Sequence, residues 1–482
     1  MAFPSDSDAK LAHLLRRAGF GARPSEWAAF QKMGLQGATQ MLLHPEQTPD
    51  NLKALLEQIG GDYVDTNDLG SVRQWWLYRM VHTRRPLEEK MTLFWHNHFA
   101  TAIYKVDNSN MMWRQNETFR RDGLGSFRTL LQKVARDPAM LVWLDGRDNH
   151  AGKPNENFAR EVMELFTLGV AGGYSERDVQ EAARAFTGWR GEGSAPGGYI
   201  YDPTLHDDGE KTVLGQTGNW HADDVCDILA SHPSTARFIS TKLFKFFVHD
   251  NPTKVDIDKL AKVYLDKQFD IRAVVESIFT SDVFYSETAR FAKIKSPVEF
   301  CVMTIRAYDA PLAAARDLQR SLSLMGQDLF NPPNVKGWSE GRDWINTRTL
   351  LARVNFASQL TDEMKNRVSL QDRLRAFQSG DAAPSISKLG GGEAMMNAPA
   401  MAAPAMNAMA APAMDAPQNG ATDAQNAVEA LWQGLMMGMP LTPARRAELV
   451  AFCTKEDGSD DTAARLPGLF NLIVSAPEYQ LA

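Results

Sequence analysis

Apolar residues recur at a helical spacing along most of this chain of 482 residues. In the segment from Ser7 to Arg17, Leu11, Leu14 and Leu15 form one apolar stripe before a glycine stop signal. Because almost every periodic segment repeats at about 3.6 residues, the sequence predicts an all-α, multi-helical single body. After an opening helical hairpin we expect helices at residues 72–82, 87–100, 126–135, 157–168, 178–189, 223–230, 235–248, 255–266, 271–280, 297–307, 312–324, 347–360, 427–437, 443–452 and 463–474.

The segment from 190 to 220 is the exception, because glycine and polar turn residues replace the helical pattern there. Residues 199–201 and 212–214 are expected to pair as a small β-hairpin insertion around Asp207-Asp208-Gly209, since Asp-Gly is a turn signal. A long loop with its own small sheet often carries function in a compact domain. The alternative is a solvated insertion without a function of its own.

Residues 394–413 consist only of alanine, methionine, proline and asparagine. Repeated prolines, without any charged or aromatic side chain, neither hold a regular helix nor specify a core. We therefore expect a helical main body over residues 1–374 and a disordered low-complexity tether over 375–424. The helices at 425–482 are expected to dock on the main body, because they are too small to fold comfortably alone.

Charge and hydropathy exclude several classes of protein. Lys and Arg number 52 against 59 Asp and Glu, a net charge of −7, so the basic excess needed for nucleic-acid binding is missing. No stretch of about 18 apolar residues occurs, which predicts no transmembrane segment. The start shows no basic region followed by an apolar one, so no signal peptide is recognised. The expected location is cytoplasmic, with periplasmic residence or export with a partner as the alternative.

The sequence lacks the binding motifs of most common cofactors. Cys226, Cys301 and Cys453 stand far apart without a C-x-x-C element, which argues against a thiolate cluster, a redox dithiol and haem c. There is no phosphate-binding P-loop and no G-x-G-x-x-G turn, so no nucleotide cofactor is expected. There is also no G-x-S-x-G and no H-E-x-x-H. Candidate chemistry therefore has to be sought in clusters of polar residues.

The helix expected at 157–168 places two carboxylates and an amide on one stripe. Asn157, Glu161 and Glu164 lie at i, i+4 and i+7, whereas apolar residues occupy the other side. Glutamates at i, i+3 repel each other by about 0.2–0.5 kcal/mol on an exposed helix, and a bound cation would relieve that repulsion. The alternative is a solvated face on which Arg160 pairs with Glu164.

Two histidines stand near the end of the apolar segment expected to be helical at 87–100. His96 and His98 point about 200° apart on a regular helix, so one of them at most can be a metal ligand. Both could converge only if the helix ends at His96. The alternative is an imidazole that is buried in the core and hydrogen-bonded there.

A third polar cluster lies at the expected turn, where His206 stands beside Asp207 and Asp208. Such a cluster can supply nitrogen and oxygen ligands to a divalent cation. It can also supply a general base, His206, that is oriented by Asp207. The alternative is an ordinary hydrophilic turn, and only convergence of the three clusters in one pocket would favour a common site.

Eight motifs occur in the order of a known family: HLLRRAGFGA at 13–22, MTLFWHNHFAT at 91–101, NENFAREVMELFTLGV at 155–170, YSERDVQEAARAFTGW at 174–189, HDDGEKTVLG at 206–215, HPSTARFISTKLFKFFV at 232–248, IKSPVEF at 294–300 and MGQDLFNPPNVKGW at 325–338. Through them the chain resembles the bacterial domain-of-unknown-function family 1800, from about residue 8 onward apart from the tether. The resemblance implies helical, mostly exported bacterial proteins without an established activity, often encoded beside a sulfatase-like family. This chain departs from that pattern in lacking a recognisable signal. The family motifs include the histidines and glutamates above and assign them no role.

Two hypotheses follow. In the first, the protein is a metal-dependent enzyme, a hydrolase or an oxidoreductase that uses Zn, Mn or Fe. Its ligands would come from Glu161, Glu164, His206 and either His96 or His98, with Asp207 as a supporting group. In the second, it is a non-catalytic envelope or maturation partner of a sulfatase-like protein, and it binds through the tether or through the loop that carries Trp338 and Trp344.

Overall fold

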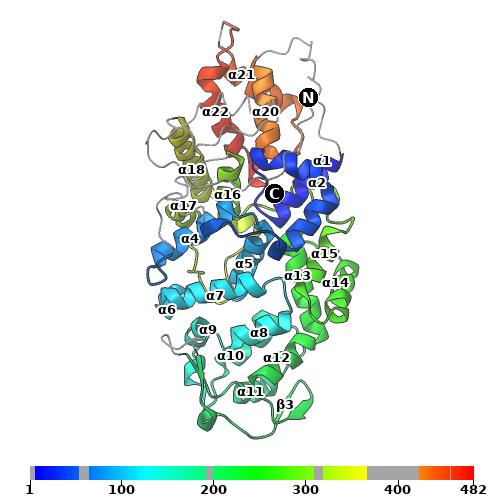
Figure 1. Cartoon of the computed structure of the whole chain (residues 1–482), viewed down its shortest axis with the longest axis vertical. Coiled ribbons are helices and arrows are strands. Elements are labelled where there is room, and N and C mark those ends of the chain that lie inside the picture. Colours follow the sequence, from blue (N-terminus) through cyan, green and yellow to red (C-terminus); the bar gives the residue numbers. More distant parts are fainter. Residues whose placement is uncertain (1–5, 54–63, 192–198, 309–317, 366–422, 456) are drawn as a thin grey trace, which may run out of the picture.

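Helices dominate the computed structural model, which describes residues 6–53, 64–191, 199–308, 318–365, 423–455 and 457–482 (Figure 1). The all-α class with a small β insertion is confirmed. Across those described ranges, no helix combines the length and the apolar composition that crossing a bilayer would require.

The main body begins with two packed helices, α1 (Asp6–Ala18) and α2 (Pro24–Leu43), and α2 is kinked at Gly34, whose φ is +71°. The elements that follow, up to the β insertion, are η1 (Pro45–Gln47), α4 (Leu69–His82), α5 (Pro86–His98), α6 (Ile103–Val106), α7 (Ser109–Asp122), α8 (Phe127–Ala135), α9 (Pro138–Trp143), η2 (Gly146–Asp148), α10 (Glu156–Glu161), the π-helical turn η3 (Val162–Thr167) and α11 (Glu176–Ala185).

The second half of the chain returns along the body. Its elements are α12 (Ala222–Ser231), α13 (Pro233–Phe247), α14 (Lys254–Asp266), α15 (Ile271–Phe279), α16 (Pro297–Ala307), α17 (Leu318–Met325), η6 (Gly341–Trp344), α18 (Thr347–Lys365), α20 (Asp423–Met436), α21 (Pro443–Cys453), α22 (Thr462–Ser475) and η8 (Pro477–Gln480).

Helix α5 lies within the main body, where it packs on α1, α2, α4 and α7. Its Glu89 is fully buried and accepts hydrogen bonds from Arg79 Nε at 2.7 Å, Arg120 Nε at 2.8 Å and Trp76 Nε1 at 3.0 Å. Burial acts to raise the pKa of Glu89, but the guanidiniums of Arg120 and Arg79 outweigh it and lower the pKa to about 2. The carboxylate is therefore a charged anchor for α4, α5 and α7.

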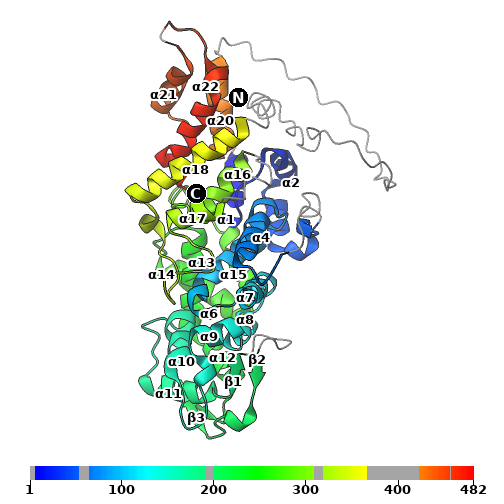
Figure 2. The same cartoon turned by 90° about the vertical axis from the view of Figure 1, so that its left-hand side faces the viewer.

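The last three helices rest on the end of the main body that also holds α1 (Figures 1 and 2). Helix α22 packs on α18, and the backbone N–H of Ala482 donates to the carbonyl of Lys293 at 2.8 Å. The N–H of Lys295 likewise donates to the carbonyl of Gln480 at 2.8 Å. Of the tether predicted over 375–424, residues 375–422 lie outside the described part, whereas Asp423 and Ala424 belong to α20. The tether itself stays a prediction.

The β insertion consists of two hairpins rather than the single one expected. Strand β1 (Trp189–Gly191) pairs with β2 (Tyr199–Tyr201), and β3 (Lys211–Val213) pairs with β4 (Gln216–Gly218). The predicted pairing of 199–201 with 212–214 is therefore wrong. The turn forms instead at Leu214 and Gly215, whose φ values of +49° and +77° suit a tight two-residue turn.

Candidate metal centre

A short segment between the end of α11 and strand β1 positions His206. Helix α11 begins with a capping box, in which Ser175 N–H donates to Asp178 Oδ2 at 2.8 Å. After its end the chain passes Thr187 and turns at Gly188, where φ is +88°. A Cβ on Gly188 would lie 3.0 Å from the carbonyl oxygen of Asp202 and 3.3 Å from Cβ of His206. Glycine therefore lets the returning chain pack closely here.

The imidazole of His206 is buried, with 5 % of the residue exposed. Its Nδ1 lies 3.0 Å from the carbonyl oxygen of Thr187, and because a carbonyl can only accept, Nδ1 carries the proton. Burial, as the first cause, lowers the pKa of His206, so the ring is neutral near pH 7. Its Nε2 then presents a lone pair, and that atom is buried without a hydrogen-bond partner among the described residues. This is the arrangement of a metal-binding histidine that is oriented by a backbone carbonyl.

Two further potential ligands lie close to the side chain of His206. One ligand atom each from His206, Asp208 and His221 lies within 4.8 Å of the other two. The imidazoles of His206 and His221 stack with centroids 4.2 Å apart and planes 12° from parallel. Asp208 and His221 are exposed to solvent, and the hydroxyl of Tyr201 lies 3.5 Å from Nδ1 of His221. Two imidazoles and one carboxylate form a donor set that suits zinc or non-haem iron.

Asp207, which was expected to orient His206, binds Arg184 instead. Its carboxylate accepts two hydrogen bonds from Arg184, from Nε at 2.8 Å and from Nη2 at 3.0 Å. Hydrogen bonding to Arg184 is the first cause that lowers the pKa of Asp207 to about 2. Nζ of the buried Lys211 donates to the carbonyls of Asp207 and Gly209 at 2.5 and 2.9 Å. These contacts fix the backbone of the turn from which Asp208 projects.

His96 and His98 lie in the core, and neither presents a free lone pair. Nε2 of His96 accepts from the N–H of Phe330 at 3.1 Å, so in the neutral ring Nδ1 must hold the proton. Burial lowers the pKa of His96 to about 3, which keeps the ring neutral. Nε2 of His98 donates to the carbonyl of Phe166 at 3.0 Å, and its Nδ1 accepts from Nζ of Lys242 at 3.2 Å. Both rings have the contacts of hydrogen-bonded core histidines.

Glu161 and Glu164 are near neighbours, as the sequence predicts, although the helix changes between them. Glu161 ends α10, and Glu164 lies in the π-helical turn η3. Burial first, and then the charge of Glu164, raise the pKa of Glu161. The alternative interpretation paired Arg160 with Glu164, but the ion pairs of Arg160 are with Glu176 at 2.7 Å and Glu156 at 3.0 Å.

Of the predicted ligands, the structure places only His206 in a cluster of three potential donors, as far as the described residues extend. Its companions are Asp208, which the sequence placed in the same turn, and His221, which sequence reasoning missed. His221 lies 15 positions further on, immediately before α12, and no recognised motif joins it to His206. The available signal was a second histidine at the far end of the same glycine-rich insertion.

The protein is thus a helical body with a two-histidine, one-carboxylate cluster on a small β insertion. A family model described as "Protein of unknown function (DUF1800)" matches residues 13–481, so the chain belongs to that family. No curated protein matches the chain, and no solved structure matches it. The comparisons name neither a cofactor nor a partner, and the sulfatase-like partner and the cellular location stay predictions.

Proposed function

We propose that the protein is a metal-dependent hydrolase that binds one divalent cation, zinc foremost, through His206, Asp208 and His221. The observation that carries the proposal is the lone pair of His206 Nε2, which is buried and unpartnered within the described residues, on a side chain that lies close to two further potential ligands, Asp208 and His221. A neutral imidazole held by a backbone carbonyl is prepared for a metal before any metal arrives.

The spacing of the donors supports the assignment. Zinc ligands at about 2.0–2.2 Å stand roughly 3.3 Å apart around a tetrahedral ion. The present separations of up to 4.8 Å therefore need to contract by up to about 1.5 Å. His221 must also turn its ring out of the present stack, because two nearly parallel imidazoles cannot both direct in-plane lone pairs at one ion. Asp208 and His221 can supply these movements, because both are exposed and can rotate about their side-chain bonds, while His206 is fixed.

Three protein ligands leave a coordination position for water, the pattern of catalytic rather than structural zinc sites. A cation there lowers the pKa of bound water toward neutrality and so supplies a nucleophile. The exposure of Asp208 and His221 favours hydrolysis over oxidation, because reactive oxygen intermediates require a site closed to solvent. Tyr201, near His221, and Trp189, whose ring lies 4.9 Å from that of Tyr201, offer an aromatic surface beside the cluster.

Metal analysis tests the binding. Purified protein should be stripped with a chelator, incubated with Zn²⁺, Mn²⁺ or Fe²⁺, desalted and assayed for metal by mass spectrometry. We expect about one ion per chain in the wild type and none in His206→Gln or His221→Gln. His249→Gln, which also removes an imidazole but lies outside the cluster, should bind like the wild type. A wild type that retains no ion under any of the three conditions would refute the proposal.

The reaction class is tested on the same preparations. A panel of p-nitrophenyl esters and phosphates should show turnover that chelation removes and the added metal restores, with loss in His206→Gln. The double variant Glu161→Gln/Glu164→Gln distinguishes this cluster from the one expected from sequence. If that variant loses the metal while His206→Gln keeps it, the predicted carboxylates rather than the insertion form the site.

A further inference from the structure

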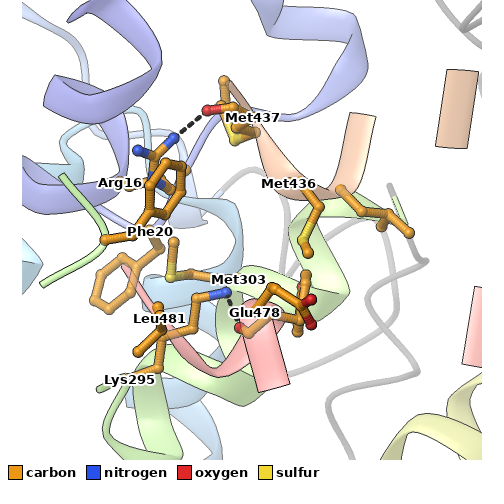
Figure 3. Close-up of a pocket in the computed structure, with 13 residues that line it drawn as sticks. Arg16, Phe20, Lys295, Met303, Met436, Met437, Glu478 and Leu481 are labelled. Atoms are coloured by element: carbon orange, nitrogen blue, oxygen red, sulfur yellow. Dashed lines mark hydrogen bonds between the residues drawn. The ribbon is translucent and has the colours of Figure 1, made fainter. Parts of the chain in front are cut away.

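A small cavity lies away from the β insertion, where α1 and the C-terminal helices meet α16 and the residues just before it (Figure 3). Its lining includes Arg16 of α1, Lys295 before α16, Met437 after α20, and Glu478 of η8. The cavity measures about 10 Å³, room for about one water-sized particle.

Arg16 brings a positive charge into this cavity without an ionic partner. Only 3 % of the residue is exposed, and Nη1 donates to the carbonyl of Met437, as Figure 3 shows. The guanidinium carbon lies 4.2 Å from the centre of the Phe291 ring. Its Nε is buried without a hydrogen-bond partner, and no carboxylate forms an ion pair with Arg16 in the described ranges.

Lys295 brings a second positive group to the same cavity. The residue is 3 % exposed, and Nζ donates to the carbonyl of Tyr479 at 2.5 Å and lies 3.7 Å from the centre of that ring. Burial first, and then the charges of Arg16 and Arg353, lower the pKa of Lys295 well below its usual value. The ammonium carries three N–H donors, and the carbonyl of Tyr479 accepts only one of them.

The nearby carboxylates are bound to other cations. Glu478 lines the cavity, but its two oxygens accept from Arg445 Nη2 at 3.1 and 3.2 Å. Glu299, the acid whose charge acts on Lys295, forms its ion pair with Lys90. Burying the charge of Arg16 without a counter-charge opposes folding strongly. Repulsion from Arg16, added to burial, lowers the pKa of Lys295 and so works against its charged form. An anion between them would relieve both costs.

We propose that this cavity binds one monatomic anion, chloride, between Arg16 and Lys295. Nε of Arg16 and the free protons of Lys295 would donate to it. The dimensions exclude a phosphate group with its full set of oxygens unless the cavity opens. The anion would stabilise the contact between α1 and the C-terminal helices, because Arg16 and Lys295 already bind the carbonyls of Met437 and Tyr479.

The direct test is the line width of the ³⁵Cl resonance, which broadens when chloride exchanges with a site on a protein. The wild type should broaden the line, and added bromide should narrow it again by competition at the same site. Gluconate, too large for the cavity, should have no effect at equal ionic strength. A line that the wild type does not broaden, or that gluconate narrows as well as bromide does, would overturn the proposal.

Thermal unfolding with matched variants supplies the second test. The melting temperature of the wild type should be higher in chloride than in gluconate, and the difference should saturate with concentration. Arg16→Met and Lys295→Met should abolish this difference. Arg17→Met removes a neighbouring buried arginine that does not line the cavity, so the difference should persist there. A chloride effect equal in the wild type and Arg16→Met would be a general salt effect and would overturn the assignment.

Discussion

The buried carboxylate of Glu89 should contribute a large and pH-dependent share of stability, which Glu89→Gln would remove. The side chain is fully buried and bound by Arg79 and Arg120. Its pKa falls from 4.5 to about 2, a difference of about 2.5 units, and at 1.36 kcal/mol per unit this amounts to about 3 kcal/mol. Loss of one partner in a buried ion pair costs about 3–5 kcal/mol, in agreement with that figure.

The sign of the pH dependence follows from the lowered pKa. A carboxyl group whose pKa is depressed by folding stabilises the protein fully above its unfolded value, near 4.5. The stabilisation then declines as pH falls toward about 2. The difference in unfolding free energy between wild type and Glu89→Gln should therefore be about 3 kcal/mol at pH 7 and about 2 kcal/mol at pH 3.5.

Urea unfolding followed by tryptophan fluorescence at several pH values measures this difference. Glu117→Gln is the matched control, because Glu117 also pairs with Arg120 but is about one-third exposed, so its loss should cost about 1 kcal/mol or less. The reasoning fails if Glu89→Gln unfolds at the wild-type urea concentration at pH 7. It also fails if the gap between the two proteins does not narrow as pH falls.

Three further outcomes are expected. Asp207→Asn should weaken metal binding about tenfold in a chelator competition while leaving one ion per chain, because Arg184 would no longer hold the turn before Asp208. Gly215→Ala should cost about 1 kcal/mol through its positive φ alone, since nothing lies within 4 Å of the added Cβ, and β3–β4 amides should exchange about fivefold faster. All three cysteines are buried and burial raises their pKa, so a disulfide reagent should label them only after unfolding; rapid labelling of the native protein would contradict this.

The sequence was sufficient for the helical class, because apolar periodicity and end signals act locally. The helices predicted at 271–280 and 297–307, for example, form as α15 (Ile271–Phe279) and α16 (Pro297–Ala307). Strand pairing in the insertion could not be predicted from such local signals. The Asp-Gly signal is overridden, because Arg184 and Lys211 hold the segment around Asp207 in a different conformation.

At the candidate site, too, local sequence predicts some features, whereas others depend on tertiary contacts. His206 could be chosen from its polar neighbours, but the choice between Asp207 and Asp208 depends on which carboxylate Arg184 binds, a tertiary contact. His221 joins the cluster only through the path of the two hairpins. The lone pairs of His96 and His98 accept hydrogen bonds from Phe330 N–H and from Lys242, which are distant in sequence. No local pattern could therefore reveal that these histidines lack a free lone pair for a metal.

The long axis of the molecule separates the β insertion from the helices that surround Arg16 and Lys295 (Figure 1). Free-energy changes from substitutions at distant sites without shared partners usually add. A double variant of His206 and Arg16 should therefore show the sum of the two single effects, on metal affinity and on stability alike. Substitutions in the insertion should then leave the closure of the helical body unchanged, so the two ends can be altered independently.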